Sequence, residues 1–173
     1  MQKAISNTSP LLYLHRIGRL DWLNSMFTEI WVPGAVINEL KDGIQKGYDS
    51  PNPDKYPWMK LVEPNKTPSE WLSLDLGRGE ISAMALALEN PGCIVLLDDA
   101  LARRTAQAAG LCVWGTLKIL LEAKNRGLTE RIAPLLKRLE EKDMWISEDI
   151  HNRILLLAGE IEENIRDYSD QRD

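Results

Sequence analysis

The alternation of apolar and polar residues is clearest over residues 76–113, where it predicts helix, strand, helix and strand in that order. Small apolar residues favour the first helix, and Asn90-Pro91-Gly92 ends it. Residues 93–97 form a continuous apolar run, which is typical of a strand buried on both faces. Asp98-Asp99 follows this strand directly, and an alanine-rich helix then runs to Gly110. Strands separated by helices in this way predict a parallel α/β sheet.

The same pattern continues on both sides of this stretch. Further apolar runs predict strands over residues 3–6, 29–32 and 59–62. Ser9 is expected to cap the helix after the first strand, with Pro10 as its first helical residue. Two amphipathic helices close the chain, and Pro134 is expected to kink the first of them. Residues 43–57 are rich in Gly and Pro and predict a long loop that is either functional or mobile.

The length of 173 residues fits one domain with its own hydrophobic core. We expect this domain over residues 1–166, with residues 128–166 as a helical C-terminal extension packed on it. The last helix carries one apolar stripe, formed by Ile150, Ile154, Leu157 and Ile161. Residues 167–173 have nothing to bury, so we predict a disordered tail there.

Composition and charge limit the kinds of protein that this chain can be. A net charge of −5 does not indicate a nucleic-acid-binding protein, so such a role requires a local basic patch. Cys93 and Cys112 lie in predicted buried strands without metal or redox spacing, which indicates reduced core thiols in a cytosolic protein. No leader-like segment opens the chain and no apolar run approaches about 20 residues, so we expect a cytoplasmic protein without a membrane span. The six tryptophans are interpreted as core residues rather than a platform for stacking bases.

Four polar residues are expected to meet at one edge of the predicted sheet. Asn7 and Asp98 each stand at the carboxyl end of a strand, and ligands of α/β sheets bind outside these ends. Glu39 and Glu80, on neighbouring helices, are placed to lean into the same crevice. Clustered carboxylates without His or Cys favour hard cations such as Mg²⁺ or Mn²⁺. The sequence therefore predicts a single cation within reach of all four side chains.

Each of these residues also has a purely structural interpretation. Glu80 suits the first turn of a helix, where it complements the helix dipole, and Asp98 or Asp99 suits a helix N-cap. Glu39 alone is typical of an exposed helix residue, and Asn7 alone is typical of a turn. The coincidence of all of them at one crevice favours a functional site.

Four segments together resemble the PIN-domain family, a group of nuclease-like proteins that includes the VapC-type toxins. In chain order the segments are ISNTSPLLYL, WVPGAVINEL, LGRGEISAMALALE and IVLLDDALARRTAQAAGL. The later segments WGTLKILLEAKNRGL and RILLLAGE are similar to a less studied PIN-like branch of nucleic-acid-binding proteins. The resemblance covers nearly all of residues 4–160.

The resemblance implies a three-layer α/β fold with a five-stranded parallel sheet in the order 3-2-1-4-5, flanked by helices and followed by two closing C-terminal helices. It implies divalent metal held by residues that match Asn7, Glu39, Glu80 and Asp98, with Asp99 as the alternative to Asp98. An aspartate is usual at the position of Asn7, so the loss of one charge should weaken metal binding. Many relatives cleave single-stranded RNA, often as dimers held by a cognate antitoxin.

Three functions follow from these observations. The first is a Mg²⁺- or Mn²⁺-dependent endoribonuclease, as the toxin of a toxin–antitoxin pair and as a homodimer. Its candidate substrate-binding residues are Arg78, Arg103, Arg104, Thr116 and Lys118. The second is a PIN-like binding or regulatory protein that has lost efficient cleavage through Asn7. The third, a phosphoacceptor domain, ranks last because such domains carry acids at the first strand, where this chain has only Asn7.

Overall fold

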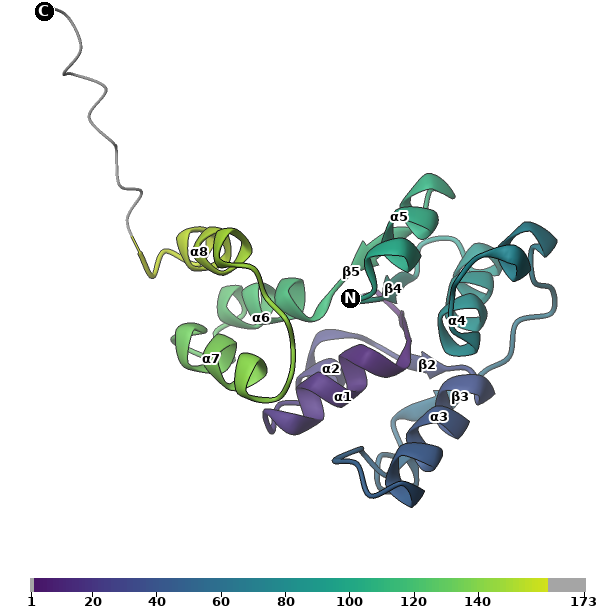
Figure 1. Ribbon diagram of the computed structural model, residues 1–173, viewed down its shortest axis with the longest axis horizontal. Coiled ribbons are helices and arrows are strands. Elements are labelled where there is room, and N and C mark those ends of the chain that lie inside the picture. The colour runs from purple at the N-terminus through teal and green to yellow at the C-terminus, as the bar shows by residue number, and fades with distance from the viewer. Residues whose placement is uncertain (1, 162–173) are drawn as a thin grey trace, which may run out of the picture.

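Five short parallel strands form the centre of the molecule, which a computed structural model describes for residues 2–161 (Figure 1). The predicted order 3-2-1-4-5 is confirmed. Adjacent strands pair in register, with Ala4 beside Ile30 and Ile94, and Ile94 beside Cys112. The strands are β1 (Ala4–Ser6), β2 (Ile30–Val32), β3 (Met59–Leu61), β4 (Ile94–Leu96) and β5 (Cys112–Trp114).

Helices cover both faces of this sheet, as the α/β prediction requires. They are α1 (Thr8–Arg16), α2 (Trp22–Met26), α3 (Gly34–Gln45), α4 (Arg78–Glu89), α5 (Ala100–Ala108), α6 (Thr116–Asn125), α7 (Ala133–Glu141) and α8 (Glu148–Leu157). Figure 1 shows α7 and α8 grouped beside α6, on the opposite side of the molecule from α3 and β3. Within residues 2–161, no helix is long and apolar enough to cross a membrane.

The two central strands divide the core because successive side chains point to opposite faces. Ala4 and Ile94 pack with α1, α2, α3, α6 and α7, whereas Ile5 and Val95 pack with α4 and α5. All four side chains are almost completely buried. Because both faces of these strands are buried, their sequences are unbroken apolar runs. The same packing fixes the polar residues that follow the strands at one edge of the sheet.

Helix starts are where the structure corrects the sequence-based expectations. Asn7, not Ser9, is the N-cap residue of α1, so Pro10 is the third helical residue rather than the first. Pro134 is the second residue of α7, a position where the missing N–H costs nothing, and it begins this helix instead of kinking it. Between β3 and α4 the chain also forms a 3₁₀ helix, Ser69–Ser73.

Several predicted core residues lie at the surface. Cys112 is exposed on the edge strand β5, and Cys93 is only partly buried. Trp145, just before α8, is 83% exposed, so the interpretation of all six tryptophans as core residues is wrong for this one. On α8, Ile150 and Leu157 are exposed, and Ile161, which lies beyond its end, is exposed as well. The predicted tail, residues 167–173, lies outside the described residues.

The long segment over residues 43–57 includes the 3₁₀ helix Pro53–Lys55, which Asn52 caps by accepting a hydrogen bond from the Asp54 N–H. Ser50 donates a hydrogen bond of 2.9 Å to the Leu40 carbonyl and fastens the segment to α3. These bonds give the predicted loop a defined path beside α1 and α3.

Glu160 ties the end of the described chain to two other helices. Its carboxylate accepts hydrogen bonds from Lys124 Nζ at 2.8 Å, from the Ile132 N–H at 2.6 Å and from the Ala133 N–H at 3.0 Å. The last two donors lie at the N-terminus of α7, where a negative charge is favourable. Burial alone would raise the pKa of Glu160, but these donors and the Lys124 charge outweigh it and lower the pKa.

We expect Glu160→Gln to lower the free energy of unfolding by about 1–3 kcal/mol, because it removes charge-assisted hydrogen bonds from a side chain that is 5% exposed. Since the folded-state pKa lies below the ordinary value of 4.5, this contribution is present above that value and is lost as pH falls through the folded-state pKa. Urea unfolding of both proteins between pH 7 and pH 3 measures the difference. The matched control is Glu141→Gln on exposed α7 surface, and an equal loss in both variants would contradict the role of Glu160.

Candidate functional site

The carboxyl ends of β1 and β4 form one edge, and the predicted site residues begin there. Asn7 directly follows β1, and its backbone N–H donates a hydrogen bond of 3.1 Å to the Leu96 carbonyl at the end of β4. Asp98 and Asp99 lie two and three residues beyond Leu96. The strand order reverses between β1 and β4, so this edge is the switch point where α/β proteins bind ligands.

Asn7 is buried, with 3% of its surface exposed, and its side-chain oxygen receives no hydrogen bond from the described residues. It occupies the N-cap of α1 without making the usual side-chain capping hydrogen bond. Its Oδ1 is the one fully buried side-chain polar atom without a hydrogen-bond partner among residues 2–161. Leaving such an acceptor unpaired costs about 1–3 kcal/mol, and buried groups of this kind are typical of functional sites.

Glu39 of α3 lies beside Asn7, and Gly79 of α4 makes room for both. The Glu39 carboxylate accepts hydrogen bonds from the Thr8 hydroxyl and, at 2.9 Å, from the Gly79 N–H. A Cβ placed on Gly79 would stand 2.7 Å from Asn7 Oδ1 and 2.7 Å from Glu39 Oε2. Only glycine leaves these two oxygens in place. The sequence contained an indication of this role. A glycine within a helix of otherwise strong helix formers lowers the stability of the helix, so its presence suggests that close packing requires it.

Glu80, the next residue of α4, is half-buried and has a structural role as well. Its Oε2 accepts a hydrogen bond of 2.8 Å from the Gly77 N–H, which satisfies a free donor at the start of the helix. Burial raises the pKa of Glu80, and the nearby carboxylates of Asp99, Glu39 and Asp75 raise it further. Negative charge is therefore concentrated between α3, α4 and the start of α5, which a cation would relieve.

Asp98 and Asp99 face different surroundings. Asp98 accepts hydrogen bonds of 2.7 Å from both the backbone N–H and the hydroxyl of Thr116. Burial raises the pKa of Asp98, and the Thr116 donors and the Arg103 charge oppose this rise. Asp99 is the N-cap of α5 and accepts a hydrogen bond of 2.8 Å from the Ala102 N–H. The charge of Asp99 contributes to the raised pKa of Glu80, whereas Asp98 is held by Thr116 on the side of α6.

The prediction that one cation lies within reach of all four candidate side chains does not hold for the side-chain positions observed. Among residues 2–161, no three His, Cys, Asp or Glu side chains lie close enough together to share an ion. The reason is that each carboxylate is turned to a donor of the protein itself: Glu39 to Gly79, Glu80 to Gly77 and Asp98 to Thr116. The structure does bring Asn7 and Glu39 together, and it places Glu80 and Asp99 near enough to interact electrostatically.

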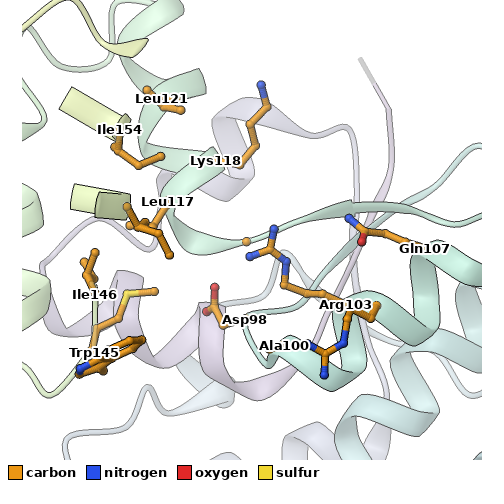
Figure 2. A pocket seen from close by; sticks show the side chains of 14 residues that line it. Asp98, Ala100, Arg103, Gln107, Leu117, Lys118, Leu121, Trp145, Ile146 and Ile154 are labelled. Carbon is orange, nitrogen blue, oxygen red and sulfur yellow. The ribbon is translucent and has the colours of Figure 1, made fainter. Parts of the chain in front are cut away.

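Three of the four predicted basic residues gather at one pocket next to Asp98. We define the Trp145 pocket by Asp98, Arg103, Arg104, Leu117, Lys118, Trp145, Ile146 and Ile154, and its volume is about 590 Å³. In Figure 2 the Asp98 carboxylate lies between Trp145 on one side and Arg103 on the other. Thr116, the first residue of α6, positions Asp98, and Arg78, exposed at the start of α4, does not line this pocket.

The donor set fits a divalent metal. It consists of oxygen atoms alone, one of them the unpaired Asn7 Oδ1, beside the Glu39 carboxylate in a space that a Cβ on Gly79 would fill. Hard cations such as Mg²⁺ and Mn²⁺ prefer carboxylate and amide oxygens. Asn7 and Glu39, whose oxygens the structure brings together, are thus the residues that would hold such an ion, with Glu80 and Asp99 as nearby negative charges.

Comparison with known proteins agrees with the fold. A family model described as PIN domain matches residues 3–160, which is nearly the whole chain. No curated protein matches it. The family match spans every strand of the parallel sheet and all of the candidate site residues. PIN domains have a nuclease fold that occurs often in toxin–antitoxin systems, binds nucleic acid and generally uses divalent metal ions. The chain belongs to the PIN-domain family.

Proposed function

We propose that this protein is an endoribonuclease that cleaves single-stranded RNA with the help of Mg²⁺ or Mn²⁺. The observation that carries the proposal is the unpaired, buried Asn7 Oδ1 beside Glu39, in a space kept open by Gly79. A polar atom with no partner in the protein, next to a carboxylate at the switch point of the sheet, is explained by a bound cation.

Different residues of the chain are assigned to binding the metal ion and to binding the RNA backbone. Asn7 and Glu39 would hold the ion, the Thr8 hydroxyl and the Gly79 N–H fix the position of the Glu39 carboxylate, and Glu80 and Asp99 would add negative charge nearby. A bound divalent cation supplies an activated water and neutralises charge on the phosphate. Arg103, Arg104 and Lys118 hold the phosphates of the RNA backbone, and Thr116 fixes Asp98 beside them. Arg78, exposed at the start of α4, remains a candidate for a further phosphate contact.

The direct test is cleavage of a labelled, unstructured RNA in Mg²⁺, in Mn²⁺ and in EDTA. We expect cutting with either metal, stronger with Mn²⁺, and none in EDTA. Duplex RNA and single-stranded DNA serve as substrate controls. Undiminished cutting in EDTA would rule out the metal mechanism, and no cutting under any condition would rule out the nuclease.

The two adjacent aspartates offer a matched pair of variants. We expect Asp99→Asn to reduce cleavage by about a hundredfold, because it removes a charge from the group that includes Glu39 and Glu80. Asp98→Asn should reduce cleavage much less, because its oxygen still accepts from the Thr116 N–H. Initial rates at saturating Mn²⁺ measure both. A larger loss for Asp98→Asn would make Asp98 the ligand instead.

The role of the enzyme is proposed to be that of a toxin controlled by a cognate antitoxin, as is often the case for this fold. The alternative is a PIN-domain protein that binds RNA without efficient cleavage, and Asn7 favours it because the site holds one charge fewer than a site with aspartate there. Cleavage that stays absent even at high Mn²⁺, together with RNA binding, would favour this alternative.

We also expect a homodimer formed through α8. Leu157 is 64% exposed, and Leu156 of the same helix is exposed as well, so the helix presents apolar surface that a second copy would cover. Leu157→Asp should shift the protein to a monomer in analytical ultracentrifugation. The matched control, Leu72→Asp, changes a leucine that is 66% exposed on the 3₁₀ helix before α4. A wild-type protein that stays monomeric at all concentrations would contradict the prediction.

A further inference from the structure

A second pocket lies on the other side of the candidate metal site. We define the Tyr48 pocket by Leu12, Arg16, Glu39, Asp42, Lys46 and Tyr48, and its volume is about 220 Å³. It shares Glu39 with the candidate metal site, and the Trp145 pocket includes Asp98, the sequence neighbour of Asp99. Both pockets therefore border the edge of the sheet that carries the candidate metal site.

The strand order places the pockets on opposite sides of the site. Glu39 belongs to the helix after β2, whereas the Trp145 pocket is built on the helices after β4 and β5. From β2 to β5 there are three strand spacings, or about 14 Å, with β1 and Asn7 between them. A strand lying in both pockets would cross the sheet between β2 and β5, where β1 and Asn7 lie.

Each pocket carries one aromatic ring that the fold leaves in solvent. Trp145 is 83% exposed and Tyr48 is 63% exposed. The Trp145 indole stands over an apolar wall that includes Leu117, Ile146 and Ile154 (Figure 2). A flat, apolar-faced group that stacks on such a ring would be enclosed by this wall.

Both pockets contain basic side chains, although the chain as a whole has a net charge of −5. In the Trp145 pocket Arg103, Arg104 and Lys118 outnumber Asp98. In the Tyr48 pocket Arg16 and Lys46 are balanced by Glu39 and Asp42. Within residues 2–161, none of these five basic side chains forms an ion pair with an acidic group. Basic groups beside exposed rings match a strand that alternates phosphates with flat bases.

From these observations we infer that the Trp145 and Tyr48 pockets are base-binding subsites on either side of the cleavage position, so that one unpaired base stacks on Trp145 and another on Tyr48. The inference rests on the proposed function for its substrate class, single-stranded RNA. It predicts a preference for RNA that is unpaired on both sides of the cleavage position, because a base held in a helix cannot reach either ring. The basic residues hold the phosphates next to each stacked base.

The test measures binding of a fluorescent, unstructured 12-nucleotide RNA by anisotropy in EDTA, where the proposed cleavage does not occur. We expect Trp145→Ala and Tyr48→Ala each to weaken binding about tenfold, and the double variant about a hundredfold, because the pockets are far enough apart for their effects to multiply. Trp145→Phe and Tyr48→Phe should retain most of the affinity, since a ring remains. Leu72→Ala, at a site that lines neither pocket, should bind like the wild type.

Four outcomes decide the inference. Wild-type affinity in both alanine variants would overturn it, and so would phenylalanine variants as weak as the alanine ones. Unchanged RNA binding by Trp145→Ala combined with loss of self-association would assign that pocket to a second copy of the chain, which also overturns it. Ring-dependent binding by a protein that never cuts RNA would uphold the two subsites while refuting the nuclease.

Discussion

Gly79→Ala is expected to reduce metal-dependent RNA cleavage by at least about a hundredfold while leaving the fold intact. The added methyl group would stand 2.7 Å from both Asn7 Oδ1 and Glu39 Oε2, so these oxygens would have to move apart. Gly79 is the second residue of α4, where alanine is the better helix former, so the helix itself should not suffer. The loss should therefore come from the displaced oxygens.

Cleavage rates in Mn²⁺ measure the effect of this variant on the reaction, and thermal unfolding without metal measures its effect on stability. The control is Leu88→Ala, which changes an exposed side chain on the same helix. We expect this control to cut RNA at the wild-type rate. If Gly79→Ala cuts as well as the wild type, the space beside Asn7 and Glu39 has no part in the reaction.

Asn7→Asp is expected to raise the affinity for Mn²⁺ about tenfold and to increase cleavage at limiting metal, because hard cations are held largely by ligand charge. Without metal the same change should destabilise the protein, since it buries a carboxylate beside Glu39. Each kcal/mol lost should lower the unfolding temperature by about 2–4 °C in a chain of this size.

The sign of this stability change distinguishes a metal ligand from a simple turn residue. Unfolding temperatures of wild type and Asn7→Asp are compared in EDTA and in excess Mn²⁺. We expect the variant to be less stable than the wild type in EDTA and more stable than it in Mn²⁺. A variant that is equally destabilised under both conditions would mean that no cation binds at Asn7.

Much of the fold followed from local patterns. Residues 93–97 read as a buried strand because both of its faces are covered, and the order of strands and helices predicted the parallel sheet. Gly110 marked the end of α5 because it adopts a positive φ value of 78° that other residues avoid. The start of α1 was misplaced because Asn7 and Ser9 are both good N-cap residues, and only the end of β1 decides between them.

The candidate site was harder to predict, because its details depend on how distant segments pack. The role of Gly79 arises only where α3 meets α4, a contact between segments 40 residues apart in the chain. The sequence favoured Asp98 over Asp99 because it lies closer to the end of β4, yet Thr116 holds Asp98 while Asp99 caps α5. The exposure of Trp145 depends on how the segment before α8 returns to α6, which no local pattern encodes.

Direct titration of Mn²⁺ into the metal-free protein, followed by calorimetry or by electron paramagnetic resonance, tests the central claim that these residues form a divalent metal site. The account predicts saturable binding that weakens about ten- to a hundredfold in Glu39→Gln and in Gly79→Ala, and that strengthens in Asn7→Asp. Leu88→Ala should bind like the wild type. Binding that is absent from the wild type and from Asn7→Asp, or that is the same in all of these proteins, would contradict the account.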